Sequence, residues 1–237
     1  MKKISLGKLI LGSRPAIVVP FSGTVTAPAV RRAKAAGMDA AELRLDLYPS
    51  LSPDIFIREI RKFKGTPVIA TVRSRKEGGK WSGSEKERLE LFKAVFPLVD
   101  AVDIELSSKV ILKEVLREAR RLKKTVIVSY HNFSRTPSRP FLEKILKDAK
   151  SAGAGIVKIA AMARSEKDLR ILAEFTGARA SENLITLSMG SRGAFSRVLL
   201  PALGSLLTFA HTGKATAPGQ LDLKTTALYL EAFNSRR

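Results

Sequence analysis

Short apolar runs recur along the whole chain of 237 residues, and a segment with helical features follows most of them. Each run has the length and the apolar character of a buried strand. The expected strands are Ala16–Phe21, Ala40–Asp46, Pro67–Arg73, Ala101–Leu106, Thr125–His131, Gly155–Ala160, Leu184–Ser188 and Leu206–Ala210. A strand–helix unit that recurs eight times predicts an α/β fold, the closed parallel (β/α)8 or TIM barrel.

Amphipathic segments separate the expected strands. The clearest ones are Asp54–Phe63, Glu85–Phe96, Lys109–Leu122 and Phe141–Ala152. Serine is a common N-cap and glycine a common C-cap of helices, so residues of both types should mark helix ends. The expected N-caps are Ser84, Ser138 and Ser165, and the expected C-caps are Gly37, Gly65 and Gly177.

A doubly wound open sheet is the competing fold, but it usually carries a glycine-rich nucleotide turn after its first strand. Ser22-Gly-Thr-Val-Thr26 follows the first strand here, and GxGxxG is absent from the sequence. The segment Gly7–Arg14 has the glycine spacing of a P-loop without its Lys-Ser/Thr pair. The first fifteen residues instead predict a hairpin that turns near Gly7 and closes the bottom of the barrel. With no linker visible, one catalytic barrel domain over residues 1–237 is expected.

The amino-acid composition excludes some classes of catalytic and metal site. The chain has no cysteine and two histidines, which excludes thiolate catalysis and a histidine cluster for zinc. The numbers of Asp and Glu residues do not exclude a magnesium ion held by carboxylates. No cofactor and no metal are expected. The apolar stretch Val198–Ala210 is too short to span a membrane, and Lys8 interrupts the apolar run near the start. We therefore expect a cytoplasmic protein.

The net charge of +20 comes from 42 Lys and Arg against 22 Asp and Glu. Such an excess attracts anionic ligands, and it is also found in nucleic-acid-binding proteins. The basic residues are spread over many segments, without a basic tail or an aromatic-interleaved stripe. Solvated outer helix faces are the simpler interpretation, and a nucleic-acid partner is not expected.

Side chains alternate between the two faces of a strand, so each expected strand can be divided into an inward and an outward set. Five consecutive strands send ionisable groups inward: Glu42, Arg44, Asp46, Arg73, Asp103, Glu105, His131 and Lys158. Buried charges are costly unless they are paired. These residues converge on the carboxyl-terminal mouth, where barrel enzymes hold their active sites. The alternative is a structural ion-pair network.

Lys158 and His131 lie on adjacent strands and both face inward. A lysine among Arg44, Arg73 and the histidine has its charged form disfavoured, and a neutral amine can attack a ketone to form an iminium. His131 has the intrinsic pKa to remove the proton that the iminium acidifies. A carboxylate such as Glu77 or Glu105 could orient the imidazole.

Two loops complete the expected site. Gly190–Arg197 follows the seventh strand and opens a helix, where Arg197 can hold a carboxylate in a bidentate fork. Thr216–Gln220 follows the eighth strand and offers a hydroxyl and an amide on a Gly-Pro turn. Little in the segment from His211 to Gln220 could anchor it, which favours a mobile lid. We expect His211 itself to be a structural or loop-packing residue.

Together these motifs resemble the type I 3-dehydroquinate dehydratases, almost from end to end. The matching segments are Glu42-Leu-Arg44-Leu-Asp46, Thr71-Val-Arg73 with Glu77-Gly-Gly79, Ser129-Tyr-His131-Asn-Phe133 with Thr136-Pro137, Val157-Lys158-Ile-Ala160, Met189-Gly190 with Gly193 and Ser196-Arg197, and Ala217-Pro-Gly-Gln220. Each segment is short, but their order and their placement at strand ends make the combined match specific.

The resemblance implies a role for each residue. Lys158 would form the iminium with the C3 ketone of 3-dehydroquinate. His131, with Glu77 as its partner, would remove a C2 proton and help expel the C1 hydroxyl, giving 3-dehydroshikimate in the shikimate pathway of aromatic amino-acid biosynthesis. Substrate-binding residues would be Arg197, Thr216 and Gln220 at the carboxylate and the lid, and Glu42, Arg44 and Arg73 at the ring hydroxyls. Thr216 stands where the family commonly has serine.

Two other functions stay open at this point. Another Schiff-base barrel, such as a sugar-phosphate aldolase, would also use an inward lysine, although it would need a phosphate cup. A basic nucleic-acid-binding scaffold would leave the inward ionisable residues unexplained. The sequence also leaves open whether the chain forms a homodimer.

Overall fold

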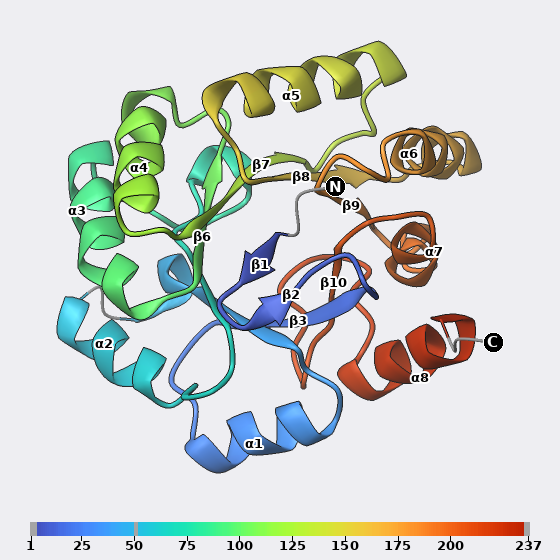
Figure 1. Cartoon of the computed structure of the whole chain (residues 1–237). Coiled ribbons are helices and arrows are strands. Elements are labelled where there is room, and N and C mark those ends of the chain that lie inside the picture. Colours follow the sequence, from blue (N-terminus) through green and yellow to red (C-terminus); the bar gives the residue numbers. More distant parts are fainter. Residues whose placement is uncertain (1–3, 50–51, 235–237) are drawn as a thin grey trace.

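The computed structural model of the chain describes residues 4–49 and 52–234 (Figure 1). Eight parallel strands form one sheet in the order β10-β3-β4-β5-β6-β7-β8-β9. Their bounds are β3 Ala16–Phe21, β4 Ala40–Arg44, β5 Val68–Thr71, β6 Ala101–Glu105, β7 Thr125–Asn132, β8 Ile156–Met162, β9 Leu184–Met189 and β10 Leu207–Phe209. Across the seam between β9 and β10, the Leu206 amide donates to the Leu184 carbonyl at 2.9 Å. The predicted TIM barrel is confirmed in this nearly closed form.

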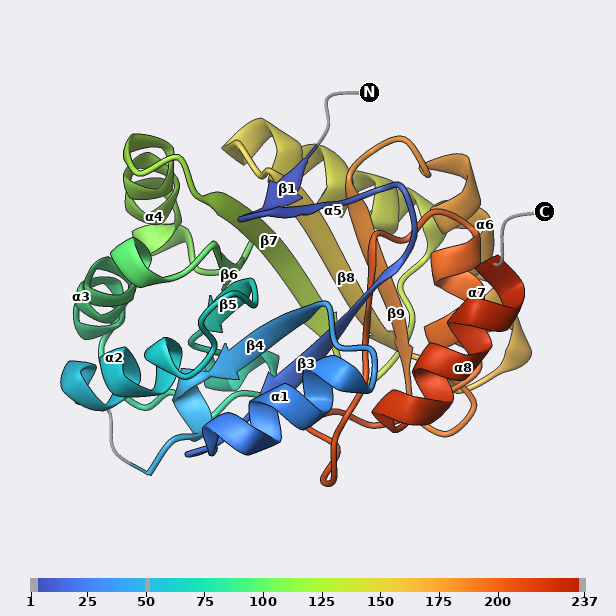
Figure 2. The same cartoon turned by 60° about the horizontal axis from the view of Figure 1, so that its bottom comes forward.

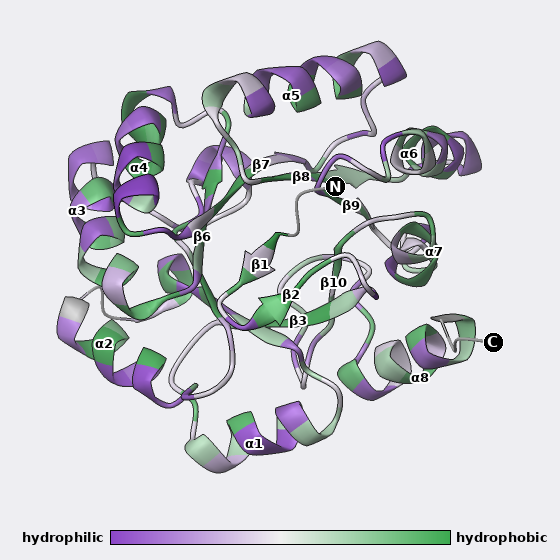
Figure 3. Ribbon diagram, viewed as in Figure 1, coloured by the Kyte–Doolittle hydropathy of each residue, from purple (hydrophilic) through white to green (hydrophobic). Residues whose placement is uncertain are grey.

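Helices surround the strands as an outer ring (Figure 1). They are α1 Ala27–Ala35, α2 Pro53–Arg61, α3 Glu85–Val95, α4 Lys109–Arg121, α5 Arg139–Ala152, α6 Glu166–Ala178, α7 Ser196–Ala202 and α8 Leu223–Asn234. Three 3-10 turns, η1 Leu45–Leu47, η2 Arg75–Glu77 and η3 Phe96–Leu98, connect elements between β4 and β6. Hydrophilic and hydrophobic residues alternate around helices such as α4 and α5 in Figure 3, as expected for helices with one face on the barrel.

The amino-terminal hairpin lies across one end of the barrel, on the side that faces the viewer in Figure 1 and the top in Figure 2. Strands β1 (Ser5–Leu6) and β2 (Leu9–Ile10) pair antiparallel around Gly7, as predicted. Leu6 is fully buried against apolar residues at the amino-terminal ends of the barrel strands, such as Ala101 and Ile127. The hairpin therefore closes the bottom and leaves the carboxyl-terminal mouth open.

Two apolar layers result from the alternation of side chains along the strands. The outward-facing residues pack against the helices in one large core, for example Leu43 of β4 and Ile104 of β6. A smaller core inside the barrel contains Ile69, Ile127 and Ile156 below the polar residues. The strand parity predicted from the sequence is confirmed, because the inward positions above this smaller core carry the ionisable side chains.

Most predicted caps are confirmed. Ser84 and Ser165 cap α3 and α6 with capping boxes, and Ser138 is the N-cap residue of α5. Gly37 directly follows the end of α1 and has a φ of +104°, which suits glycine. The predictions for Gly65 and Gly177 are wrong, since α2 ends at Arg61 with Lys62 as its C-cap residue and α6 continues through Gly177 to Ala178. Glycine lowers helix stability, but the apolar face of α6 buried by Leu172 and Phe175 outweighs that preference.

Candidate active site

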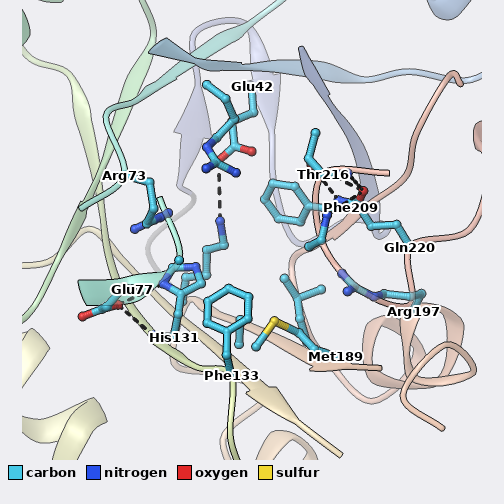
Figure 4. A pocket seen from close by; sticks show the side chains of 16 residues that line it. Glu42, Arg73, Glu77, His131, Phe133, Met189, Arg197, Phe209, Thr216 and Gln220 are labelled. Carbon is cyan, nitrogen blue, oxygen red and sulfur yellow. Dashed lines mark hydrogen bonds and ion pairs between the residues drawn. The ribbon is translucent and has the colours of Figure 1, made fainter. Parts of the chain in front are cut away.

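A pocket at the carboxyl-terminal mouth encloses about 570 Å³, counting the part open to solvent (Figure 4). All nine residues assigned to the site from the sequence line it. They are Glu42, Arg44, Arg73, Glu77, His131, Lys158, Arg197, Thr216 and Gln220. Ala160, Leu187, Met189, Phe133 and Phe209 add apolar surface. A concave, partly apolar site with a few convergent polar groups is typical of small-molecule binding.

Lys158 projects from β8 into the pocket, and only 4% of the residue is exposed. Its ammonium donates to Asp103 Oδ2 at 2.9 Å and lies 3.6 Å from Glu42 Oε1. The ammonium also sits 4.2 Å from the centre of the Phe209 ring. The expected surroundings of cations alone are wrong, because two carboxylates contact this lysine directly. Its nearest groups therefore hold the amine in place as an ion pair.

A buried network of charged groups supports Asp103 from behind. Arg73 donates to Asp103 Oδ1 at 2.8 Å and to Glu105 Oε1 at 2.9 Å. Burial alone would raise the pKa of Asp103, but Arg73 and Lys158 outweigh it and lower that pKa. The fully buried Arg88, on α3, pairs with the other oxygen of Glu105. Glu105 thus binds two guanidinium groups and does not orient His131.

Glu77 is the carboxylate that holds His131. One oxygen, Oε2, accepts from the His131 backbone amide at 2.8 Å and lies 3.0 Å from His131 Nδ1. The other oxygen, Oε1, accepts from the Ser107 hydroxyl at 2.5 Å. Figure 4 shows the Glu77 side chain directed at the imidazole. Because Glu77 occupies Nδ1, the second ring nitrogen, Nε2, is left to face the pocket.

The pKa values of this pair are shifted in opposite directions. Burial raises the pKa of Glu77 to about 7, against the opposing effects of Ser107 and Arg73. Burial, together with Arg73 and Lys158, lowers the pKa of His131 well below its usual 6.5. The imidazole is therefore neutral at physiological pH, so it can accept a proton.

Arg197 lies across the pocket from His131, beside Gln220 (Figure 4). It is fully buried, and within residues 4–49 and 52–234 it forms no ion pair. Its Nη2 donates to the Pro218 carbonyl at 3.2 Å, while its Nε finds no hydrogen-bond partner in that part of the chain. Burial lowers the pKa of Arg197 to about 10. A buried guanidinium without a carboxylate is suited to bind one from a ligand.

The loop after β10 is tied down more firmly than the sequence argument expected. Gln220 Oε1 accepts from the Thr216 amide at 2.7 Å, and Gln220 Nε2 donates to the Thr216 hydroxyl at 3.2 Å. The Pro218 carbonyl accepts from the Gly190 amide at 3.3 Å. The expectation that little anchors this segment is therefore wrong. His211 takes part in loop packing, as predicted, because its Nδ1 accepts from the Gly213 amide.

Ser107 and Arg88 are supporting residues that the sequence does not indicate. Neither lies at an inward strand position: Ser107 is in the short loop after β6, and Arg88 is on the barrel-facing side of α3. A serine beside a strand end and an arginine on an amphipathic helix give no specific signal. Within the described part of the chain there is also no cluster of His, Asp and Glu that could hold a metal ion. In the same residues, no helix has the length and apolar character needed to cross a membrane.

Comparison with known proteins agrees with this geometry. The family model described as type I 3-dehydroquinase matches residues 18–235. A 3-dehydroquinate dehydratase of Methanococcoides burtonii is 37% identical over 96% of this chain and 100% of its own length. A second, from Methanothermobacter thermautotrophicus, is 42% identical over 85% of this chain and 90% of its own length.

Solved structures extend the likeness to the fold. The 3-dehydroquinate dehydratase of Geobacillus kaustophilus superposes with a TM-score of 0.89 at 28% identity, covering 99% of this chain and 98% of its own. The type I enzyme of Clostridium difficile, solved with covalently modified comenic acid, has a TM-score of 0.88 at 28% identity and covers 99% of both chains. This chain belongs to the type I 3-dehydroquinase family.

Proposed function

We propose that this protein is a 3-dehydroquinate dehydratase that works through a Schiff base on Lys158, with His131 as general acid and base. The observation that carries the proposal is the arrangement of one pocket: a buried lysine, a histidine held by Glu77, and a buried arginine that has no carboxylate partner in the described part of the chain. Membership of the family supplies the substrate, and these residues supply the chemistry.

The first step forms the covalent link. The Lys158 amine adds to the C3 ketone of 3-dehydroquinate, and loss of water gives an iminium. Before attack the ammonium gives up a proton, and a proton is returned to the carbinolamine oxygen as it leaves, so that ammonium and ketone give iminium and water. The adjacent Asp103 and Glu42 carboxylates keep the amine directed into the pocket. The positive iminium then takes the place of the ammonium beside Asp103. A cation therefore lies beside the Asp103 carboxylate both before and after attack.

The second step removes water. His131 takes a proton from C2, and the electron pair moves into the C2–C3 bond to give an enamine. The enamine expels the C1 hydroxyl, which leaves as water with a proton from His131, and the C1–C2 double bond forms. Hydrolysis of the iminium releases 3-dehydroshikimate and restores Lys158. The neutral state of His131 suits the first proton transfer.

Substrate binding follows from the rest of the pocket. Arg197, with Gln220 and Thr216 beside it, would hold the substrate carboxylate. Glu42 and Arg44 would contact ring hydroxyls. Arg73 would do so only from the base of the pocket, since its guanidinium is already bonded to Asp103, Glu105 and Ser129.

Ultraviolet absorbance during incubation with 3-dehydroquinate tests the proposal, because dehydration creates a conjugated enone. We expect the absorbance to rise with the wild-type protein and to stay flat with Lys158→Ala. A sugar-phosphate aldolase in the same fold would give no rise with this substrate, and that result would overturn the proposal.

A further inference from the structure

Exposed basic side chains surround the mouth of the barrel. They lie in the loops that follow five of the strands, and all seven are exposed. These residues, here called the basic collar, are Arg75, Lys76, Lys80, Arg135, Arg164, Arg192 and Lys214. Within residues 4–49 and 52–234, none of the seven forms an ion pair with a carboxylate.

Acidic side chains hardly offset this charge at the mouth. In the described loops between strand ends and helix starts, the carboxylates are Asp46 and Glu77, which are buried, and Asp222, which is exposed. Other acidic residues begin only in the first turns of α2, α3 and α6. Two of these, Glu87 and Asp168, are engaged in capping boxes. The exposed mouth therefore carries a strong positive excess.

At the opposite end of the barrel some charges of opposite sign meet, while Lys8, Lys64 and Lys123 there form no ion pair in the described chain. Asp39 pairs with Arg14, and Glu182 pairs with Lys150. Asp100 lies next to the hairpin and accepts from the Val68 amide at 2.9 Å. Part of the +20 charge of the chain thus lies in the loops around the mouth.

Several collar residues lie in the same loops as residues that line the pocket. Arg75 and Lys76 precede Glu77 in the same 3-10 turn, η2. Lys214 lies two residues before Thr216, and Arg192 lies in the loop that leads to Arg197. The loops that supply pocket residues therefore also hold the cations at its rim.

We propose that the basic collar attracts the anionic substrate electrostatically and raises its concentration at the mouth before Arg197 binds the carboxylate. The inference rests on the proposed function, since it requires a substrate that carries a carboxylate. Charges of one sign around a cleft raise the local concentration of an oppositely charged ligand by about 10-fold or more. The effect acts over about 10 Å at 0.1 M salt, so it needs no direct contact.

The test compares two triple variants with the wild-type enzyme. The collar variant is Lys76→Gln, Arg192→Gln and Lys214→Gln. The control variant removes the same charge away from the mouth, with Lys8→Gln and Lys64→Gln at the bottom and Lys113→Gln on the outer face of α4. The KM and kcat for 3-dehydroquinate are measured for all three proteins at about 0.02 M and 0.5 M KCl, salt concentrations that differ strongly in screening.

We expect the collar variant to raise KM about 3- to 10-fold at low salt, with kcat within about twofold of wild type, and the control variant to change neither. At high salt the three KM values should converge, because salt screens exposed charges. The product keeps the carboxylate, so its inhibition constant should rise in parallel with KM. Charge reversal at the same three collar positions should enlarge each effect.

Several outcomes would overturn the inference. An unchanged KM in the collar variant, or an increase that persists at high salt, would exclude long-range attraction. A large fall in kcat would place these residues in the chemistry instead. Binding of labelled single-stranded RNA that the collar variant loses, with KM unchanged, would assign the collar to a polyanion. Absence of wild-type turnover is a separate result, and it would contradict the proposed function itself.

Discussion

A single oxygen of Glu77, Oε2, accepts the backbone amide of His131 at 2.8 Å and lies 3.0 Å from Nδ1 of the same residue. The two contacts fix both the backbone and the ring of His131. At pH values above its pKa of about 7 the Glu77 carboxylate is ionised and only accepts hydrogen bonds, so the ring proton is then held on Nδ1. The other nitrogen, Nε2, is then the basic atom that faces the pocket.

Glu77→Gln tests how much this orientation contributes to turnover. The Gln amide oxygen can accept both His131 contacts, and its NH2 group can donate to the Ser107 hydroxyl, so the geometry should survive. The negative charge that makes the imidazole more basic is lost. We expect kcat to fall by about 10- to 100-fold while KM changes little. A kcat equal to wild type would contradict the role of Glu77.

The same variant should change stability in a pH-dependent way. The pKa of Glu77 in the folded protein is about 7, above the 4.5 of a free carboxyl. Between these pH values the folded state holds a proton that the unfolded state has released, so stability decreases as pH rises toward 7. Gln is neutral at every pH. Denaturant unfolding at pH 8 should therefore give Glu77→Gln a gain on the order of 1–3 kcal/mol over wild type, and little gain at pH 4. A loss at pH 8 would exclude this account.

His131→Ala separates covalent binding from proton transfer. Lys158 keeps its contacts with Asp103 and Glu42 in this variant, so the iminium should still form. Turnover should fall by about 10²- to 10⁴-fold, the usual contribution of a positioned general base. Mass spectrometry after borohydride treatment with substrate measures the adduct, and the absorbance assay measures turnover. Loss of the adduct with turnover retained would reverse the assigned roles.

Arg197→Gln should weaken substrate binding and stabilise the free protein. The guanidinium is buried without an ion pair in the described chain, and burial lowers its pKa to about 10. Replacing it by a neutral side chain removes an unfavourable buried charge. The transition-state free energy measured by kcat/KM should rise by about 2–5 kcal/mol, since the substrate carboxylate loses its partner. The melting temperature should not decrease, and an unchanged KM would exclude carboxylate binding by Arg197.

Much of the site could be predicted because strand parity follows from the sequence. The alternation of Glu42 with Leu43, and of Lys158 with Val157 and Ile159, reveals which side chains face inward. Their convergence in one pocket then follows from the parallel barrel, in which the carboxyl ends of the strands meet at one mouth. The helix caps Ser84 and Ser165 were predictable for a similar reason, since capping is local.

Other features depend on contacts between distant parts of the chain. The ion pair of Lys158 with Asp103 joins two strands that are not neighbours in the sheet, so parity alone does not predict it. Arg88 reaches Glu105 from a helix outside the barrel. The loop around Pro218 is held by Gly190 and Arg197, which lie in another loop and helix. The burial of Leu172 and Phe175 against the rest of the fold likewise explains why α6 runs through Gly177.

The central claim is that Lys158 forms the Schiff base. Borohydride reduction of the wild-type protein with 3-dehydroquinate should leave a stable adduct, and peptide mass spectrometry should place it on Lys158. Lys158→Ala should give neither the adduct nor turnover. Wild-type activity in Lys158→Ala, or an adduct on a different lysine, would contradict the account.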